Sequence, residues 1–246
     1  MVEPWLVAGV FLVAVCYSMV GHGGASGYLA LLAFTSISAE VRSTTALMLN
    51  VAVAGITFFL FQRAKHLEWG LAWPFLVGSI PLAFIGGRLR MESRIQSGIL
   101  ALVLLYASFA LLFPLKPSDS EPSPPKRTLS MGVGAGVGVL SGLIGVGGGI
   151  FLSPLMILAN WARPHQVAAI SAGFIFANSI AGLLARPTAL WTQGLQLWPL
   201  VASGSLGAIA GSYMGARKVS GKGLRQLLAV VLLVAVWKLV TKLHSI

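Results

Sequence analysis

The chain has 246 residues, of which 57% are hydrophobic and 9% are charged, and its formal net charge is +11. A soluble domain has about 25% charged residues, so this composition, with uncharged runs of helix-spanning length, excludes a soluble globular protein and predicts an integral membrane protein. The positive charge does not indicate nucleic acid, because Lys and Arg stand singly or in small groups at the ends of apolar runs, where they anchor helices to lipid headgroups.

The first half of the chain is predicted to contain five helical segments. Apolar runs predict helices over residues 4–20, 25–36, 43–62, 69–87 and 95–113. The first is expected to be a retained helix rather than a cleaved signal, because no positively charged region precedes it. Cys16, in this helix, is expected to be a small core residue.

A hydrophilic stretch rich in proline and serine follows at residues 114–127. Its composition cannot form a packed core, which predicts an exposed linker. The second half repeats the plan of the first, with predicted helices over residues 128–144, 150–161, 166–185, 191–215 and 224–243. Pro154 is expected to interrupt the short helix predicted at residues 150–161. The predicted domains are a first transmembrane repeat at 1–113, the linker at 114–127 and a second transmembrane repeat at 128–246.

Three sequence matches relate the two halves at a common offset of 124 to 125 residues. The matches are Gly21-x-Gly-Gly24 with Gly145-x-Gly-Gly148, Trp73-Pro74 with Trp198-Pro199, and Gly86 with Gly211. The predicted fold class is therefore an all-α polytopic membrane protein with two repeats of 4–5 helical segments each, 8–10 in total. If every segment crosses the membrane the repeats are inverted, and if the short segments are re-entrant they are parallel. We favour inversion, since inverted repeats with broken helices are common in transporters.

The two glycine clusters each lie inside an uncharged stretch, Glu3 to Glu40 and Arg127 to Arg163. As a single helix, either stretch would cover roughly 50 Å, which exceeds the hydrocarbon core of about 30 Å. Each stretch is therefore predicted to break at its glycines into a full helix and a shorter one. The candidate binding glycines are Gly21, Gly23, Gly24, Gly145, Gly147, Gly148 and Gly149.

Two interpretations of these glycines stay open. They can let helices pack closely, as Gly132, Gly134, Gly136 and Gly138 are expected to do. Alternatively, each break leaves the N-terminal end of a half-helix inside the membrane, where free backbone N–H groups and the positive end of the helix dipole bind an anion. A nucleotide-binding loop is excluded, because the glycines follow no βαβ pattern and no Gly-Lys-Ser/Thr is present.

Polar side chains recur near both breaks. A Ser or Thr in a membrane helix usually bonds to its own backbone, whereas an Asn is costly to leave in lipid and is expected to face the bundle interior. His22 is either a hydrogen-bonded structural residue or a group that donates to an anion or takes a proton. The candidate substrate-binding side chains are His22, Ser26, Thr44, Thr45, Asn50, Ser153, Ser171 and Asn178.

Basic residues stand at the start of the third and eighth predicted helices. They either contact lipid headgroups or form an electropositive vestibule that attracts substrate. These vestibule candidates are Arg42, Arg163 and His165. The basic balance of the whole chain also favours anions over cations.

The acidic residues are all predicted to lie on loops or at helix ends. They are Glu3, Glu40, Glu68, Glu92, Asp119 and Glu121. Cation pathways use carboxylates within the membrane, so their positions argue against a cation transporter. No metal-ligand spacing, nucleophile elbow or acid–base pair occurs in the sequence. We therefore expect no enzyme activity, no metal and no cofactor.

Two motifs resemble those of a known family. Ser141-Gly-Leu-Ile-Gly-Val-Gly-Gly-Gly-Ile-Phe-Leu-Ser-Pro154, followed by His165-Gln-Val-Ala-Ala-Ile-Ser171, resembles the second-repeat signature of the sulfite exporter TauE/SafE family of membrane permeases. Gly21–Gly24 with Arg42-Ser-Thr-Thr45 resembles the first-repeat version. The first half departs from the pattern, since His22 and Gly27 are unusual and no proline matches Pro154.

The resemblance implies export of a sulfur-containing oxyanion, such as sulfite or an organosulfonate, across the bacterial cytoplasmic membrane. It also implies that the glycine-rich segments, with the Thr, Ser and Asn positions after them, line the path. The expected partners are the lipid bilayer and a small anion, with no nucleic acid, and association into homo-oligomers stays open. A passive anion channel and a non-transporting scaffold or assembly factor are the alternative functions.

Overall fold

The computed structural model describes residues 3–32, 34–89 and 121–217, with a few isolated helical positions beyond them. The predicted helices at 95–113 and 224–243 and most of the linker lie outside these ranges. Every regular element in the described part is helical. The helices are α1 (Pro4–Met19), α2 (Ala25–Leu32), α3 (Ala39–Arg63), α4 (Trp69–Arg88), α6 (Arg127–Ile144), α7 (Gly149–Leu158), α8 (Pro164–Leu184), α9 (Thr188–Leu195) and α10 (Trp198–Arg217).

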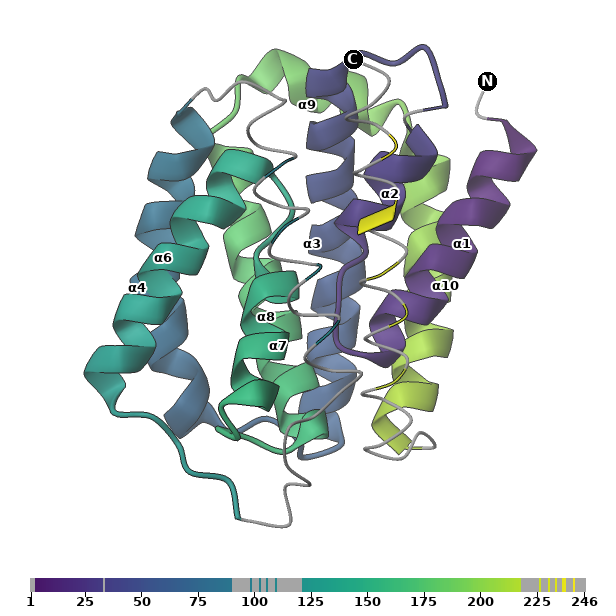
Figure 1. Cartoon of the computed structure of the whole chain (residues 1–246). Coiled ribbons are helices and arrows are strands. Elements are labelled where there is room, and N and C mark those ends of the chain that lie inside the picture. The colour runs from purple at the N-terminus through teal and green to yellow at the C-terminus, as the bar shows by residue number, and fades with distance from the viewer. Residues whose placement is uncertain are drawn as a thin grey trace.

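The long helices run roughly along one direction and form a bundle (Figure 1). α3 and α8 pack together at its centre, α4 packs with α6 on one side, and α1 packs with α10 on the other. Within the described part, α4, α6, α8 and residues Glu40–Arg63 of α3 are long and apolar enough to cross a membrane. The prediction of a helical protein that crosses the membrane several times is confirmed for these helices.

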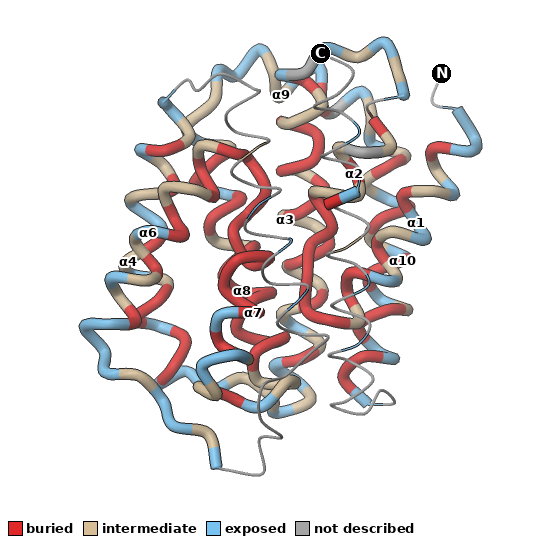
Figure 2. Tube along the Cα trace, in the orientation of Figure 1, coloured by how far each residue is buried: buried red, intermediate tan, exposed pale blue. Residues whose placement is uncertain are grey.

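Burial follows the same arrangement. Buried residues are concentrated on α3, α7 and α8 and on the inward faces of the outer helices (Figure 2). Large apolar side chains such as Phe59, Ile85 and Leu206 are more than half exposed on the outer helix surfaces. An apolar outer surface around a packed interior is the pattern expected of a helical bundle in lipid. Cys16 belongs to this outer surface, so the expectation of a core cysteine is wrong.

Both predicted breaks are confirmed. α1 ends at Met19 and α2 begins at Ala25, while α6 ends at Ile144 and α7 begins at Gly149. The connecting glycines take positive φ angles that other residues avoid. These angles are 78° at Gly21, 92° at Gly24, 75° at Gly145, 82° at Gly147 and 79° at Gly148.

Several predicted helix boundaries are wrong. The third helix begins at Ala39 rather than at residue 43, because Ser38 caps it by accepting from the Val41 N–H. The predicted 25–36 segment ends at Leu32, where the Thr35 hydroxyl donates to the Leu32 carbonyl at 2.6 Å. Side-chain caps of this kind satisfy backbone groups that the helix leaves free.

The predicted helix over 191–215 is two helices, and α7 is not interrupted. Gln196 follows the end of α9, and α10 starts afresh at Trp198. The Trp191 indole holds α9 to the end of α8 by donating to the Leu183 carbonyl at 3.1 Å. Pro154 lies inside α7, where it removes one backbone hydrogen bond, and the helix continues past it to Leu158.

Glycines bring the outer helix pairs into close contact, but only half of those predicted to do so take part. A side chain on Gly134 or Gly138 would meet the α4 backbone, at Phe75 and Ser79 respectively. Gly132 and Gly136 have open space around them. The close packing is therefore confined to one face of α6, as the helical period requires.

Candidate functional site

The two glycine breaks meet at one buried amide, that of Asn50 on α3. A Cβ on Gly23 would meet the Asn50 Oδ1, and a Cβ on Gly147 would lie 2.8 Å from the Asn50 Nδ2. Both positions also touch Ile175 on α8. Only glycine fits at such close approaches. Segments that are more than 120 residues apart in the sequence thus converge in the interior.

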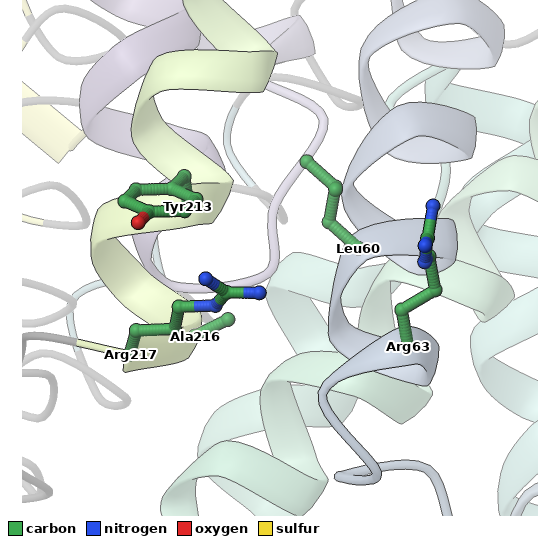
Figure 3. Close-up of a pocket in the computed structure, with 5 residues that line it drawn as sticks. All are labelled: Leu60, Arg63, Tyr213, Ala216 and Arg217. Atoms are coloured by element: carbon green, nitrogen blue, oxygen red, sulfur yellow. The ribbon is translucent and has the colours of Figure 1, made fainter.

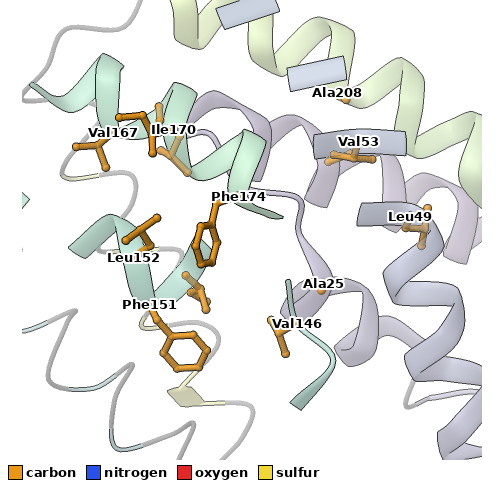
Figure 4. Close-up of a cluster of buried hydrophobic side chains, with 14 of the residues drawn as sticks. Ala25, Leu49, Val53, Val146, Phe151, Leu152, Val167, Ile170, Phe174 and Ala208 are labelled. Carbon is orange, nitrogen blue, oxygen red and sulfur yellow. The ribbon is translucent and has the colours of Figure 1, made fainter. Parts of the chain in front are cut away.

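The Asn50 amide joins α3 to α8 and to the second break. Its Nδ2 donates to the Val146 carbonyl at 3.2 Å and to the Ser179 hydroxyl at 3.4 Å. Asn50 is fully buried and Asn178 is 1% exposed, so the prediction that both face the bundle interior is confirmed. The apolar cluster that includes Ala25, Val146 and Phe174 packs around the breaks (Figure 4).

Several buried polar atoms in the described interior have no hydrogen-bond partner. A polar group without a partner costs free energy in an apolar medium, so unpaired atoms of this kind indicate a place where a ligand or water binds. The unpaired atoms at candidate positions and beside the breaks are His22 Nε2, Thr45 Oγ1, Asn50 Oδ1, Ser141 Oγ and both amide atoms of Asn178.

His22 links the two breaks. Its Nδ1 lies 3.1 Å from the Val20 carbonyl, and its ring also interacts with the backbone of Gly149, the first residue of α7. The ring meets Tyr17 edge-on, with the centroids 6.5 Å apart. His22 is 2% exposed, so the first break places a nearly buried imidazole beside the N-terminal end of the second half-helix.

The remaining hydroxyl candidates bond locally. Ser26 pairs with the Tyr17 hydroxyl at 2.9 Å. Ser153 donates to the Gly149 carbonyl at 2.9 Å and lies 2.6 Å from the Ser171 hydroxyl. Only the Ser153 bond to Gly149 fits the simpler interpretation, in which a hydroxyl in a membrane helix bonds to its own backbone, because the other two contacts join side chains of different helices. The hydroxyls therefore lie around the breaks without all pointing at one place.

The three vestibule candidates do not come together. α3 and α8 are antiparallel, since Leu47 lies against Gly182 and Phe58 against Gly173, so their starting residues lie at opposite ends of the bundle. Arg163 is the N-cap residue of α8, and its backbone N–H donates to the Gln166 Oε1 at 2.8 Å. The His165 ring stacks on that of His66 with the centroids 4.9 Å apart. Arg42 is half-buried at the other end. A single vestibule made by all three is excluded.

A residue that sequence reasoning missed lies at the Arg42 end. Arg186 follows α8 and donates to the Ser43 hydroxyl at 2.8 Å and to the Thr44 hydroxyl at 3.0 Å. Burial lowers the pKa of this guanidinium, while the charge of Glu40 opposes the shift. A basic residue after an apolar run resembles any other interface anchor, so the sequence carries no signal that separates Arg186 from them.

The opposite end of the bundle carries a surface pocket of about 380 Å³ between α3 and α10 (Figure 3). Arg217 stacks on Tyr213 with its guanidinium 4.7 Å from the ring centroid. Leu60, which lines this pocket, is ten residues beyond Asn50 on α3, or about 15 Å along the helix. The pocket is therefore separate from the glycine breaks. Its lining residues are Leu60, Arg63, Tyr213, Ala216 and Arg217.

Comparison with known proteins identifies the family. The sequence profile of the sulfite exporter TauE/SafE family matches residues 6–239. "Probable membrane transporter protein y4hK" of Sinorhizobium fredii is 32% identical over 240 residues, which cover 95% of this chain and 96% of the relative. "Probable membrane transporter protein MJ0441" of Methanocaldococcus jannaschii is 27% identical over 254 residues, covering 93% and 92%. No solved structure matches the chain. The chain therefore belongs to the sulfite exporter TauE/SafE family, whose members are multi-pass membrane transporters and not enzymes.

Proposed function

We propose that this protein exports a small sulfur-containing oxyanion, such as sulfite or an organosulfonate, across the bacterial cytoplasmic membrane. The oxyanion binds between the two halves, at the N-terminal ends of α2 and α7. The observation that carries this proposal is the meeting of both glycine breaks at Asn50. Free backbone N–H groups and the positive end of the helix dipole bind anions at such ends. The family description supports a sulfur oxyanion as the class of substrate.

The positions of the charged residues support an anionic rather than a cationic substrate. Glu3 and Glu68 occupy the N-cap positions of α1 and α4, and Glu40 lies in the first turn of α3. In the described part of the chain, carboxylates therefore lie at helix ends or in the coil before α6. A cation path needs carboxylates at membrane depth, whereas an anion can be held by backbone donors and leave again.

Reciprocal contacts support an inverted repeat. Gly86 on α4 packs against the Val139 carbonyl on α6, and Gly211 on α10 packs against the Val15 carbonyl on α1. Gly211 is 125 residues after Gly86, and Val139 is 124 residues after Val15, so the two contacts join corresponding positions of the two halves. Contacts that recur at the offset of the sequence matches are expected when two homologous halves exchange equivalent helices.

The breaks follow the same rule. Gly21 packs against Ala168 near the start of α8, and Gly145 packs against Ser43 near the start of α3. Because α3 and α8 run in opposite directions, the two halves have opposite orientations across the membrane. Rocking of the two outer helix pairs, α4–α6 and α1–α10, against each other around a central site would give alternating access.

Flux into proteoliposomes tests the function. We expect labelled sulfite or an organosulfonate to move with saturation and with counterflow, which a passive anion channel does not show. Chloride, potassium and a neutral sugar serve as controls for a leak. Movement of a cation or a neutral solute without any oxyanion would refute the central idea. A non-transporting scaffold would move none of them.

A further inference from the structure

Arg186 lies just beyond the C-terminal end of α8, at the end of the bundle where α3 begins. Its guanidinium donates to the Ser43 and Thr44 hydroxyls at 2.8 and 3.0 Å, and to the Glu40 carbonyl at 3.4 Å. Its Nη2 would also lie 2.9 Å from a Cβ on Gly145. A cation from the second half therefore touches α3 of the first half and the first residue of the second break.

The contact between Arg186 and Ser43 lies along the same α3–α8 interface as the contact between Asn50 and Ser179. Asn50 is seven residues beyond Ser43 on α3, and Arg186, two residues past the end of α8, is seven residues beyond Ser179. Seven residues make about two helical turns, or about 10 Å, and return to the same helix face. Two polar pairs thus lie on one interface between α3 and α8. The second break runs along both pairs: Gly145 lies against Ser43 and Arg186, and Gly147 lies against Asn50 and Ser179.

The guanidinium of Arg186 donates its hydrogen bonds to neutral acceptors. Its three hydrogen bonds go to two hydroxyls and a backbone carbonyl, and its Nε is buried without a partner. The charge of Glu40 also acts on this guanidinium, but its hydrogen bonds go to neutral acceptors, so the positive charge is only partly compensated and attracts an anion more strongly than a guanidinium in a direct ion pair with a carboxylate. The planar guanidinium also matches the paired oxygens of an oxyanion.

We propose that Arg186, with the Ser43 hydroxyl, forms an outer binding position for the oxyanion about two helical turns from Asn50, and that it selects anions at this mouth of the path. This inference rests on the proposed transport of an oxyanion through the Asn50 site. An anion passing between the two positions would exchange one set of donors for the next along the α3–α8 interface.

The test measures initial sulfite flux in proteoliposomes for the wild type and matched variants. Arg186→Gln removes the charge but keeps a donor for Ser43, so the KM should rise about tenfold to a hundredfold, as for the loss of a charge-assisted hydrogen bond. kcat should change less. Arg186→Lys keeps the charge but loses the planar pair of donors, so its KM should lie between those of the wild type and Arg186→Gln. Arg88→Gln removes an exposed charge at the same end, where Gly87 lies close to Ala185, and should leave the KM unchanged.

If Arg186 only stabilises the contact between α8 and α3, we expect a different result. Both Arg186 variants would then lower the Tm and leave the KM within about twofold of the wild type, the resolution of such a comparison. That outcome would overturn the outer position while sulfite transport stands. If the wild type moves no oxyanion, the proposed function fails and the outer position fails with it. If Arg186→Gln does not fold, Arg186→Lys and Ser43→Ala decide, since Ser43→Ala should raise the KM several-fold.

Discussion

Asn50 is the side chain at which the two halves of the protein converge, and its counterpart at the repeat offset is Ile175. Both residues touch Gly23 and Gly147, yet only one of them is polar. In the proposed repeat, the symmetric backbone therefore encloses a chemically asymmetric site. A single amide can hold one break by its donors and leave its Oδ1 unpaired for a ligand or water.

Replacing Asn50 by leucine should reduce sulfite flux at least about tenfold, because a buried polar contact to a charged ligand is worth about 1.5–3 kcal/mol. Leucine has a similar volume, so the fold should survive. Thr57→Val is the matched control, since it removes a buried polar group seven residues further along the same helix, away from the breaks. Equal flux in Asn50→Leu and Thr57→Val would remove Asn50 from the binding site.

His22 should affect the pH dependence of transport, since it is a titratable group beside both breaks. We expect His22→Gln to change the dependence of organosulfonate flux on pH between about 4 and 8, a range that extends below the one in which a solvated histidine changes charge. A sulfonate stays ionised over this range, so its own titration does not contribute. His66→Ala serves as the histidine control at a helix end. An unchanged profile in His22→Gln would exclude the imidazole from the mechanism.

At the scale of the elements, paired outer helices enclose the central α3–α8 pair. α6 lies so close to α4 that glycine is required where backbones touch, and α10 meets α1 in the same way at Gly207, Gly211 and Gly215. Without a hydrophobic driving force between helices in lipid, such close packing supplies much of the association. The pairs α4–α6 and α1–α10 are therefore suited to hold rigid units on either side of the breaks.

Two glycines on α6 test this packing. Gly138→Ala should lower stability by about 1–3 kcal/mol, because its Cβ would meet the Ser79 backbone and overpack the interface. Gly136→Ala, two residues away, has open space and should be neutral or stabilise the helix by up to about 1 kcal/mol. Thermal unfolding in detergent measures both. Similar Tm changes for the two variants would contradict the packing described for this helix.

The sequence predicted the features that depend on local chemistry. The breaks follow from glycine content and stretch length, and Asn50 and Asn178 face the interior because an amide is costly in lipid. The register of α3 on α8 could not be predicted, since it depends on packing between residues far apart in the chain. For the same reason Arg186 was missed. Its sequence context is that of an ordinary anchor, and only the fold places it over Ser43.

At the scale of the whole molecule, the contacts divide the described helices into two interlocked sets. The N-terminal helix of each half packs against the long outer helix of the other half, as α1 does on α10 and α6 on α4. α3 and α8 then meet at the centre, where both breaks reach them. Because each outer pair is built from both halves, the units that could rock are the pairs α4–α6 and α1–α10, and their motion would displace both half-helix ends at once.

An inverted repeat has a consequence that labelling can measure. In such a repeat α1 and α6 are equivalent helices, so their starts should lie on opposite sides of the membrane. After Cys16→Ala removes the native thiol, Glu3→Cys and Lys126→Cys each place one cysteine at an exposed N-cap, of α1 and α6 respectively. A membrane-impermeant maleimide should label only one of the two variants in sealed vesicles and both after permeabilisation. Labelling of both from the same side would mean parallel repeats, and a rocking mechanism built on inversion would then be wrong.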